Sequence, residues 1–420
     1  MRYRNRVLSL LFLLSIITYL DRVCISVAGP RMQEDLNISP QQWGWVVGVF
    51  AIAYAAFEIP SGSLGDRIGP RKVLTRIVIW WSVFTSLTGL AWSYLVLLPI
   101  RFLFGAGEAG AYPNSSASIS RWFPTVERGR AHGLVWMASR IGGAISPFLV
   151  VPIQARWGWR ASFYVFGVLG VVWAFYWYRW YRDSPAEKEG VTKAELEEIG
   201  PAPDRGHHGL PWRAALRSGN LWTIMVMYFA YCYGAFFFLS WLHTYLVRGR
   251  GFTEQALLLS TLPFVLGALA NLGGGYASDA MVRRLGLKWG RRSVAIFGLS
   301  CATLFTVATV MTSHKMLALV FLALSYAGSD FMLPTAWSVC LDIGKKYAGA
   351  VTGAMNTAGQ IGSFISSVLF GYFVAASGSY DFPLIPMAVM LTISAMLWLK
   401  IDPTQELIPE AVPAGARQAA

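Results

Sequence analysis

The strongest constraint in this sequence is a pair of charged residues inside a long apolar segment. The segment runs from Val7 to Ala28, and as a helix it would be about 33 Å long at roughly 1.5 Å per residue, enough to cross the hydrocarbon core of a bilayer. Asp21 and Arg22 lie within it. Because a charged side chain there costs about 3 to 10 kcal/mol, such residues usually face a bundle interior or a wet cavity. The pair predicts a functional site within the membrane.

The composition agrees with a protein that crosses the membrane many times. Hydrophobic residues make up 55% of the 420 residues and charged residues 14%, whereas soluble domains have about a quarter charged. The net charge of +13 comes from basic residues scattered through short loops, so we expect no nucleic-acid partner. The four cysteines lie in apolar runs without metal-ligand spacing, and we expect neither a disulfide nor a metal site.

Apolar runs long enough to span a bilayer recur along the whole chain. They predict twelve spans, near 7–28, 43–63, 73–93, 95–119, 130–153, 162–181, 219–244, 255–276, 293–313, 316–341, 349–376 and 382–400. The predicted domains are a six-helix bundle (1–181), a linker (182–217), a second six-helix bundle (218–400) and a tail (401–420). In the linker, Thr192 and Glu195 fit a capping box at the start of a short helix over 192–199.

The basic residues predict the orientation. Most of the 35 lysines and arginines fall on the side of the N-terminus, the linker and the tail, and the positive-inside rule makes that side cytoplasmic. The other side carries only Arg31, Arg156, Arg160, Arg248, Arg250 and Lys315.

An internal repeat supports two similar halves. The segment Gly133 to Gly142 aligns without gaps on Gly353 to Gly362, and Pro113 matches Pro334. Two related six-helix halves are typical of secondary transporters, whose binding site lies between the halves near the middle of the membrane.

The loop between the second and third runs carries a specific motif. It reads Gly62-x3-Asp66-Arg67-x-Gly69-x-Arg71-Lys72. This is the signature of the major facilitator superfamily, which the chain resembles over all its spans. The resemblance implies an all-α membrane protein, with two pseudo-symmetric six-helix bundles. It also makes Asp66, Arg67 and Arg71 gating candidates, because in the family this loop latches the halves as they rock.

Three further stretches resemble the anion:cation symporter branch, which includes bacterial sugar-acid/proton symporters and the vesicular glutamate and sialic acid carriers. They are Tyr19-Leu-Asp-Arg22, Gly107-Glu-Ala-Gly-Ala-Tyr-Pro113 and Ser120-Arg-Trp-Phe-Pro-Thr-Val-Glu-Arg-Gly129. The sequence departs from the branch at three positions. Gly110 and His243 stand where many members have proline, and Arg140 stands where several sugar-acid carriers have glutamine. The departures leave the exact substrate open.

The fourth run is predicted to place Arg101, Gly105, Glu108 and Tyr112 on one helical face, at spacings of four, three and four. Burial favours a neutral carboxyl and a nearby arginine favours an ionised one, so such a group can exchange a proton near neutral pH. The resemblance assigns proton coupling to Asp21 and Glu108.

Embedded arginines predict an anionic substrate, because guanidinium stays charged and matches carboxylate or phosphate. By resemblance, the binding candidates are Arg22, Tyr54 and Arg101 in the first half, with Asn356 and Gln360, one turn apart, in the second. Arg140 would add a positive charge if it faces the cavity, which favours a dicarboxylate. Alternatively it pairs with Asp330, for which pairing and proton coupling are equally plausible. A gate or loop contact is favoured for Glu58 over a titrating role.

We therefore predict a bacterial inner-membrane importer of an organic anion, such as a sugar acid or related carboxylate, driven by proton symport. Its partners would be the substrate and the lipid bilayer, with the proton as coupling ion and no cofactor. The resemblance is compatible with a monomer. An organophosphate/phosphate exchanger and a transporter-derived ligand sensor are the alternatives. An enzyme is disfavoured, because no nucleophile and base or metal-ligand motif occurs in the spans.

Overall fold

The computed structural model of the chain describes residues 2–199, 211–253, 258–344 and 348–407, and these contain helices and no strand. One group of helices precedes the linker: α1 (Tyr3–Asp35), α2 (Pro40–Ile68), α3 (Pro70–Gly89), α4 (Tyr94–Glu108), α5 (Ala111–Trp122), α6 (Thr125–Trp157) and α7 (Trp159–Trp180). The linker holds η1 (Pro185–Glu187), α8 (Lys193–Ile199) and α9 (Trp212–Ala215). The second group is α10 (Gly219–Ala235), α11 (Phe237–Ser240), α12 (Leu242–Thr244), η2 (Tyr245–Gly249), α13 (Thr261–Met311), α14 (Lys315–Gly344), α15 (Ala348–Ser377) and α16 (Leu384–Leu397).

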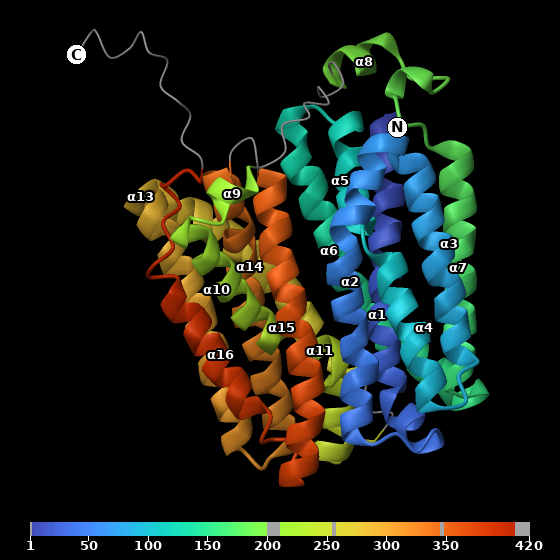
Figure 1. The fold of residues 1–420 in the computed structure, drawn as a ribbon, viewed down its shortest axis with the longest axis vertical. Coiled ribbons are helices and arrows are strands. Elements are labelled where there is room, and N and C mark those ends of the chain that lie inside the picture. The colour runs from blue at the N-terminus through green and yellow to red at the C-terminus, as the bar shows by residue number, and fades with distance from the viewer. Residues whose placement is uncertain (1, 200–210, 254–257, 345–347, 408–420) are drawn as a thin grey trace.

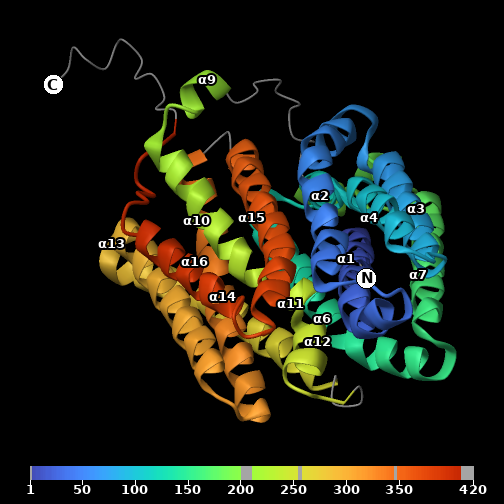
Figure 2. The ribbon, with the colours of Figure 1, turned by 60° about the horizontal axis from the view of Figure 1, so that its bottom comes forward.

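The two groups lie side by side as two helical bundles (Figure 1). The start of α1 lies at the same end as α8 and α9. We call the opposite end, with connections 36–39, 312–314 and 378–383, the distal end. Figure 2 shows α11 and α12 between the bundles, where both pack against α1. By length and composition, eight of the described helical segments are able to cross a membrane.

Several predicted spans differ from the observed helices. The run predicted as one helix over 95–119 is broken between α4 and α5, because Gly110 adopts a left-handed conformation with φ of 91°. Tyr112 therefore lies in the first turn of a new helix, so the prediction of one continuous helical face is wrong. Tyr112 still lies among the groups that act on Arg22 and Glu108. The runs at 255–276 and 293–313 are joined in α13, whose two arms meet at Gly286, a residue with non-helical backbone angles.

Local sequence sets where the second and third helices begin. At the start of α2, Ser39 and Gln42 form a capping box, in which each side chain accepts a hydrogen bond from the other residue's backbone N–H, and Pro40 takes the first helical position. Gly69 separates α2 from α3 with φ of 89°. The first turn of α3 is capped by Asp183, which accepts a hydrogen bond from the Arg71 N–H at 2.9 Å. Asp183 thus holds the chain after α7 against the signature loop.

The predicted linker helix is confirmed as α8, which Thr192 caps by accepting a hydrogen bond from the Glu195 N–H at 3.2 Å. The Glu195 carboxylate points to α1, where it accepts hydrogen bonds from the N–H groups of Tyr3 and Arg4 at 3.2 and 2.9 Å. Glu198 pairs with the Arg4 guanidinium at 2.8 Å. An acidic helix therefore rests on the positive end of the α1 dipole.

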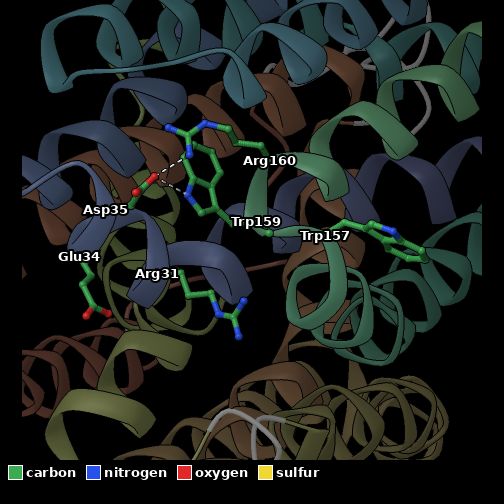
Figure 3. Close-up of a pocket in the computed structure, with 7 residues that line it drawn as sticks. Arg31, Glu34, Asp35, Trp157, Trp159 and Arg160 are labelled. Atoms are coloured by element: carbon green, nitrogen blue, oxygen red, sulfur yellow. Dashed lines mark hydrogen bonds and ion pairs between the residues drawn. The ribbon is translucent and has the colours of Figure 1, made fainter.

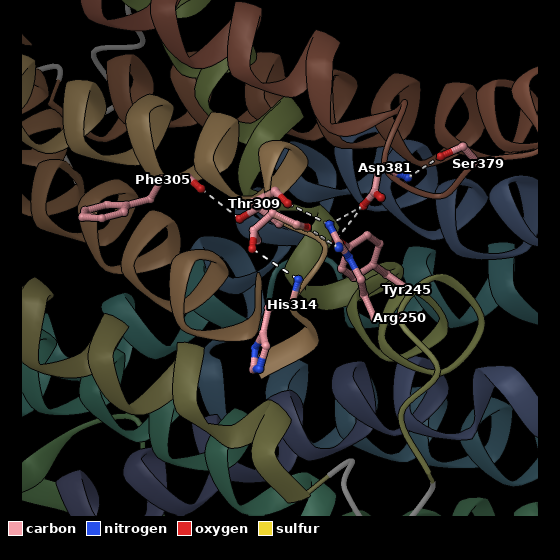
Figure 4. A network of polar contacts seen from close by, with 8 residues as sticks. Tyr245, Arg250, Phe305, Thr309, His314, Ser379 and Asp381 are labelled. Carbon is pink, nitrogen blue, oxygen red and sulfur yellow. Dashed lines mark hydrogen bonds and ion pairs between the residues drawn. The ribbon is translucent and has the colours of Figure 1, made fainter. Parts of the chain in front are cut away.

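A polar network closes the second bundle at the distal end (Figure 4). Arg250 pairs with Asp381 at 2.8 Å, donates to the Tyr245 hydroxyl at 2.7 Å, and donates to the carbonyls of Thr309 and Thr312. One side chain thereby joins the chain after η2 to the end of α13 and to the connection before α16.

Candidate functional site

A small cavity between the bundles contains two of the predicted arginines. Its walls come from α1, α2 and α4 of the first bundle, from α11 of the second, and from the residue between α10 and α11, and are formed by Arg22, Ile25, Val47, Phe50, Arg101, Phe236, Leu239 and Ser240. The cavity holds about 10 Å³, close to the lower limit for one water molecule. The bundles are therefore nearly closed around the arginines.

Arg22 forms a buried ion pair with Glu108. Its Nε lies 2.5 Å from a Glu108 oxygen, and the two side chains are 9% and 1% exposed. The guanidinium carbon also lies 4.9 Å from the centre of the Tyr54 ring and 5.4 Å from that of Tyr19. The structure thus brings together Arg22, Tyr54 and Glu108, which the sequence places on three different helices.

Asp21 and Arg101 are buried without a hydrogen-bonded counterion. Neither carboxylate oxygen of Asp21 forms a close hydrogen bond to a described residue, and the one donor that acts on this carboxylate is the indole N–H of Trp81. Nε of Arg101 has no hydrogen-bond partner among the described residues. Arg101 instead lies over the ring of Phe104, 4.5 Å from its centre. Arg101 and Glu108 are the charged groups whose fields act on Asp21. A buried carboxylate with vacant oxygens is suited to take up a proton.

Arg140 is paired across the bundles. It contacts Asp330 of α14 at 2.9 Å and donates to the Tyr326 hydroxyl at 3.0 Å. The predicted pairing of Asp330 with Arg140 is observed, so Arg140 is not a free cation in this structure. One helical turn away, Trp136 stacks on Tyr112 with ring centres 4.6 Å apart.

The predicted polar pair on α15 has two different environments. The Asn356 amide donates to both carboxylate oxygens of Glu58 on α2, at 2.8 and 3.0 Å. This contact joins the bundles. It also engages the Asn356 amide, which was predicted to bind the substrate. Gln360 keeps a buried side-chain oxygen with no hydrogen-bond partner among the described residues.

Arg71 contacts only its own bundle through the interactions observed here. It donates twice to the Tyr178 carbonyl, at 2.9 and 2.7 Å, and its guanidinium lies over the Tyr178 ring. These contacts join α3 to α7. The side chains of Asp66 and Arg67, the other gating candidates, lie outside the described residues.

No role was predicted for His243, which lies fully buried between the bundles. One ring nitrogen lies 2.9 Å from the Ser26 hydroxyl on α1, and the other lies 2.7 Å from the Ser260 hydroxyl before α13. The only available indication was its replacement of a common proline after Ser240-Trp-Leu.

A wider hollow of about 460 Å³ opens beside the first bundle, lined by Arg31, Glu34, Asp35, Trp157, Gly158, Trp159 and Arg160 (Figure 3). All of these residues belong to the first bundle or its connections. Asp35 pairs with Arg160 at 2.6 Å and accepts a hydrogen bond from the Trp159 indole at 3.0 Å. Because acidic and basic groups balance there, the hollow is a poorer anion site than the cavity between the bundles.

Comparison with known proteins identifies the family. The sequence pattern of the Major Facilitator Superfamily matches residues 11–367. The chain belongs to the major facilitator superfamily. One similar solved structure is a bacterial homolog of the human lysosomal transporter Spinster, in an inward-facing and occupied conformation. Its TM-score is 0.77 at 19% sequence identity, and the match covers 95% of this chain and 97% of the Spinster homolog. This likeness confirms the all-helical major facilitator fold.

Curated relatives agree with the predicted branch of the superfamily. The protein described as "Probable sulfoacetate transporter SauU" from Cupriavidus necator is 36% identical over 406 residues, covering 95% of this chain and 94% of its own length. The hexuronate transporter of Bacillus subtilis is 30% identical over 385 residues, covering 89% of each chain. This member of the superfamily is accordingly a multi-pass membrane transport protein and not an enzyme.

Proposed function

We propose that the protein imports an organic anion, a sugar acid or a short sulfonated or carboxylated acid, by proton symport. The observation that carries this proposal is the buried Arg22–Glu108 ion pair beside Arg101 and the buried carboxylate of Asp21, which forms no ion pair among the described residues. Two arginines attract an anion, and two carboxyl groups beside them accept protons. The names of the sulfoacetate and hexuronate relatives support the same class of substrate.

In the proposed cycle, protons neutralise Asp21 and Glu108 while the site is open to the more acidic side. Protonated Glu108 no longer holds Arg22, so Arg22 and Arg101 are free to bind the acidic group of the substrate. The bundles then rock, the carboxyl groups lose their protons inside, and Glu108 takes Arg22 back. Release of the anion follows, because its partner has been reclaimed.

The proposed topology has twelve spans, with the end that carries α8 and α9 in the cytoplasm of a bacterium and the distal end outside. The contacts between the bundles support an inward-facing, nearly occluded state. They extend from the distal end, where the Gln33 amide donates to the Thr244 hydroxyl at 2.9 Å, to the Glu58–Asn356 contact. Nearer the α8 end, a β-carbon added to Gly133 or Gly353 would meet no atom within 4 Å.

Replacing Glu108 by glutamine tests the coupling. We expect Glu108→Gln to abolish accumulation of a labelled acid driven by a pH gradient, while exchange of labelled for unlabelled acid continues. The reason is that glutamine binds no proton but leaves the arginines in place. The measurement is uptake into proteoliposomes, with and without an acid exterior, for a panel of sulfoacetate, hexuronates and phosphate esters.

The same panel separates symport from phosphate exchange. An organophosphate/phosphate exchanger would need internal phosphate and would be indifferent to the pH gradient. Accumulation by Glu108→Gln at the wild-type level under a pH gradient would contradict the role of Glu108. Movement only against internal phosphate would contradict proton symport altogether.

A further inference from the structure

A second buried ion pair, Arg140–Asp330, crosses the interface between the bundles, and the proposed mechanism does not use it. Arg140 comes from α6 of the first bundle and Asp330 from α14 of the second. The carboxylate is fully buried, and its second oxygen has no hydrogen-bond partner among the described residues. The pair therefore repeats the arrangement of Arg22 and Glu108, an arginine held by a carboxylate with one vacant oxygen.

The arginines of the two pairs lie next to the same aromatic ring. The guanidinium carbon of Arg22 is 5.4 Å from the centre of the Tyr19 ring, and that of Arg140 is 5.9 Å from the same point. The two guanidinium groups can be no farther apart than these distances together. A compact molecule with an acidic group at each end can therefore reach both arginines at once.

Few of the described groups surround the Asp330 carboxylate, and Arg140 is the one that carries a positive charge. The titratable groups that face it are Arg140, Tyr326 of its own helix and Tyr231 of α10. From α13 comes Gly267, where a β-carbon would lie 2.7 Å from the vacant Asp330 oxygen. Arg140 is thus the only cation among the described groups that act on Asp330, so a proton on Asp330 directly weakens the hold on Arg140.

We propose that Asp330 is a further proton-coupling residue and that Arg140, once released, binds the second acidic group of a dianionic substrate. This inference rests on the proposed symport function and specifies its substrate class. A proton from the medium binds a carboxylate oxygen of Asp330, and the ion pair to Arg140 breaks. Arg140 then donates hydrogen bonds to the second acid group. When the proton leaves on the other side, Asp330 reclaims Arg140 and the dianion dissociates.

The test compares a dianion with a monoanion of the same shape at several pH values. Sulfoacetate carries a sulfonate and a carboxylate, whereas ethanesulfonate keeps the sulfonate and replaces the carboxylate by a methyl group. Binding of both to the purified protein is measured by calorimetry. For sulfoacetate, the slope of log Kd against pH gives the number of protons taken up on binding.

Asp330→Asn should lower that slope by about one proton for sulfoacetate and leave the slope for ethanesulfonate unchanged. Because Arg140 loses its counterion in this variant, the neutral double variant Arg140→Gln with Asp330→Asn is measured beside it. In the double variant, the ratio of the Kd for ethanesulfonate to the Kd for sulfoacetate should fall by about tenfold or more, which corresponds to about 1.4 kcal/mol.

An unchanged slope in Asp330→Asn, or an equal loss of both ligands in the double variant, would overturn this inference. Failure of the proposed function has a different signature. In that case, the wild-type protein itself binds both anions without taking up protons.

Discussion

At the scale of single residues, Gly110 places Glu108 at the end of a helix. Its φ of 91° ends α4 directly after Glu108 and starts α5 at Ala111. A side chain costs roughly 1 to 2 kcal/mol in the left-handed conformation, and a β-carbon here would also collide with the side chain of Ser61. Glycine is therefore required for the break that leaves Glu108 at a helix end.

We expect Gly110→Ala to lower stability by at least about 1 to 2 kcal/mol. The midpoint of thermal unfolding in detergent, followed by tryptophan fluorescence, should fall accordingly. Gly133→Ala is the matched control, because a β-carbon there meets no atom within 4 Å and alanine is favoured over glycine in a helix by about 0.5 to 1 kcal/mol. Equal midpoints for the two variants would contradict the importance of the left-handed turn.

Residue types predicted which side chains gather at the site better than the contacts that these side chains make. Asp21, Arg22, Arg101 and Glu108 stand out in the sequence because charge is rare in apolar runs, and the structure gathers them near one cavity. The partners are less predictable, because they depend on how helices from different parts of the chain pack. Arg140 and Asp330 are such a pair, and so are Glu58 and Asn356.

At the scale of elements, the segment after α10 is divided into α11, α12 and η2 rather than continuing as one helix. His243 lies in α12, and its ring links the Ser26 hydroxyl of α1 to the Ser260 hydroxyl before α13. Apolar periodicity predicted one span over 219–244 and could not show these divisions, since they arise from packing between the bundles.

Replacing His243 by phenylalanine should loosen this contact. The variant keeps a ring but loses two hydrogen bonds, worth about 0.5 to 1.5 kcal/mol each, and leaves two buried hydroxyls with fewer partners. We expect faster hydrogen exchange in peptides covering residues 237–249, measured by mass spectrometry. His243→Asn retains a donor and an acceptor and should exchange more slowly than the phenylalanine variant. Exchange at the wild-type rate in His243→Phe would show that the bridge does not hold α12.

At the scale of the whole molecule, glycines allow the bundles to touch at the distal end. A β-carbon on Gly44 of α2 would lie 2.6 Å from the Ser367 carbonyl oxygen of α15. One on Gly371 of α15 would collide with the Pro40 carbonyl of α2. Backbone thus meets backbone across the interface, and any larger side chain forces the two bundles apart.

Gly371→Leu should therefore shift the protein toward a state that is open at the distal end. Spin labels on exposed Glu34 of the first bundle and exposed Ser313 of the second, in a background lacking the native cysteines, report the separation by double electron–electron resonance. The distance distribution should move to longer values in the variant. Gly353→Leu, on the same helix but in open space, should leave it unchanged. If both leucine variants give the wild-type distribution, the close contact of α2 with α15 does not control the distal end, and the rocking of rigid bundles would need another pivot.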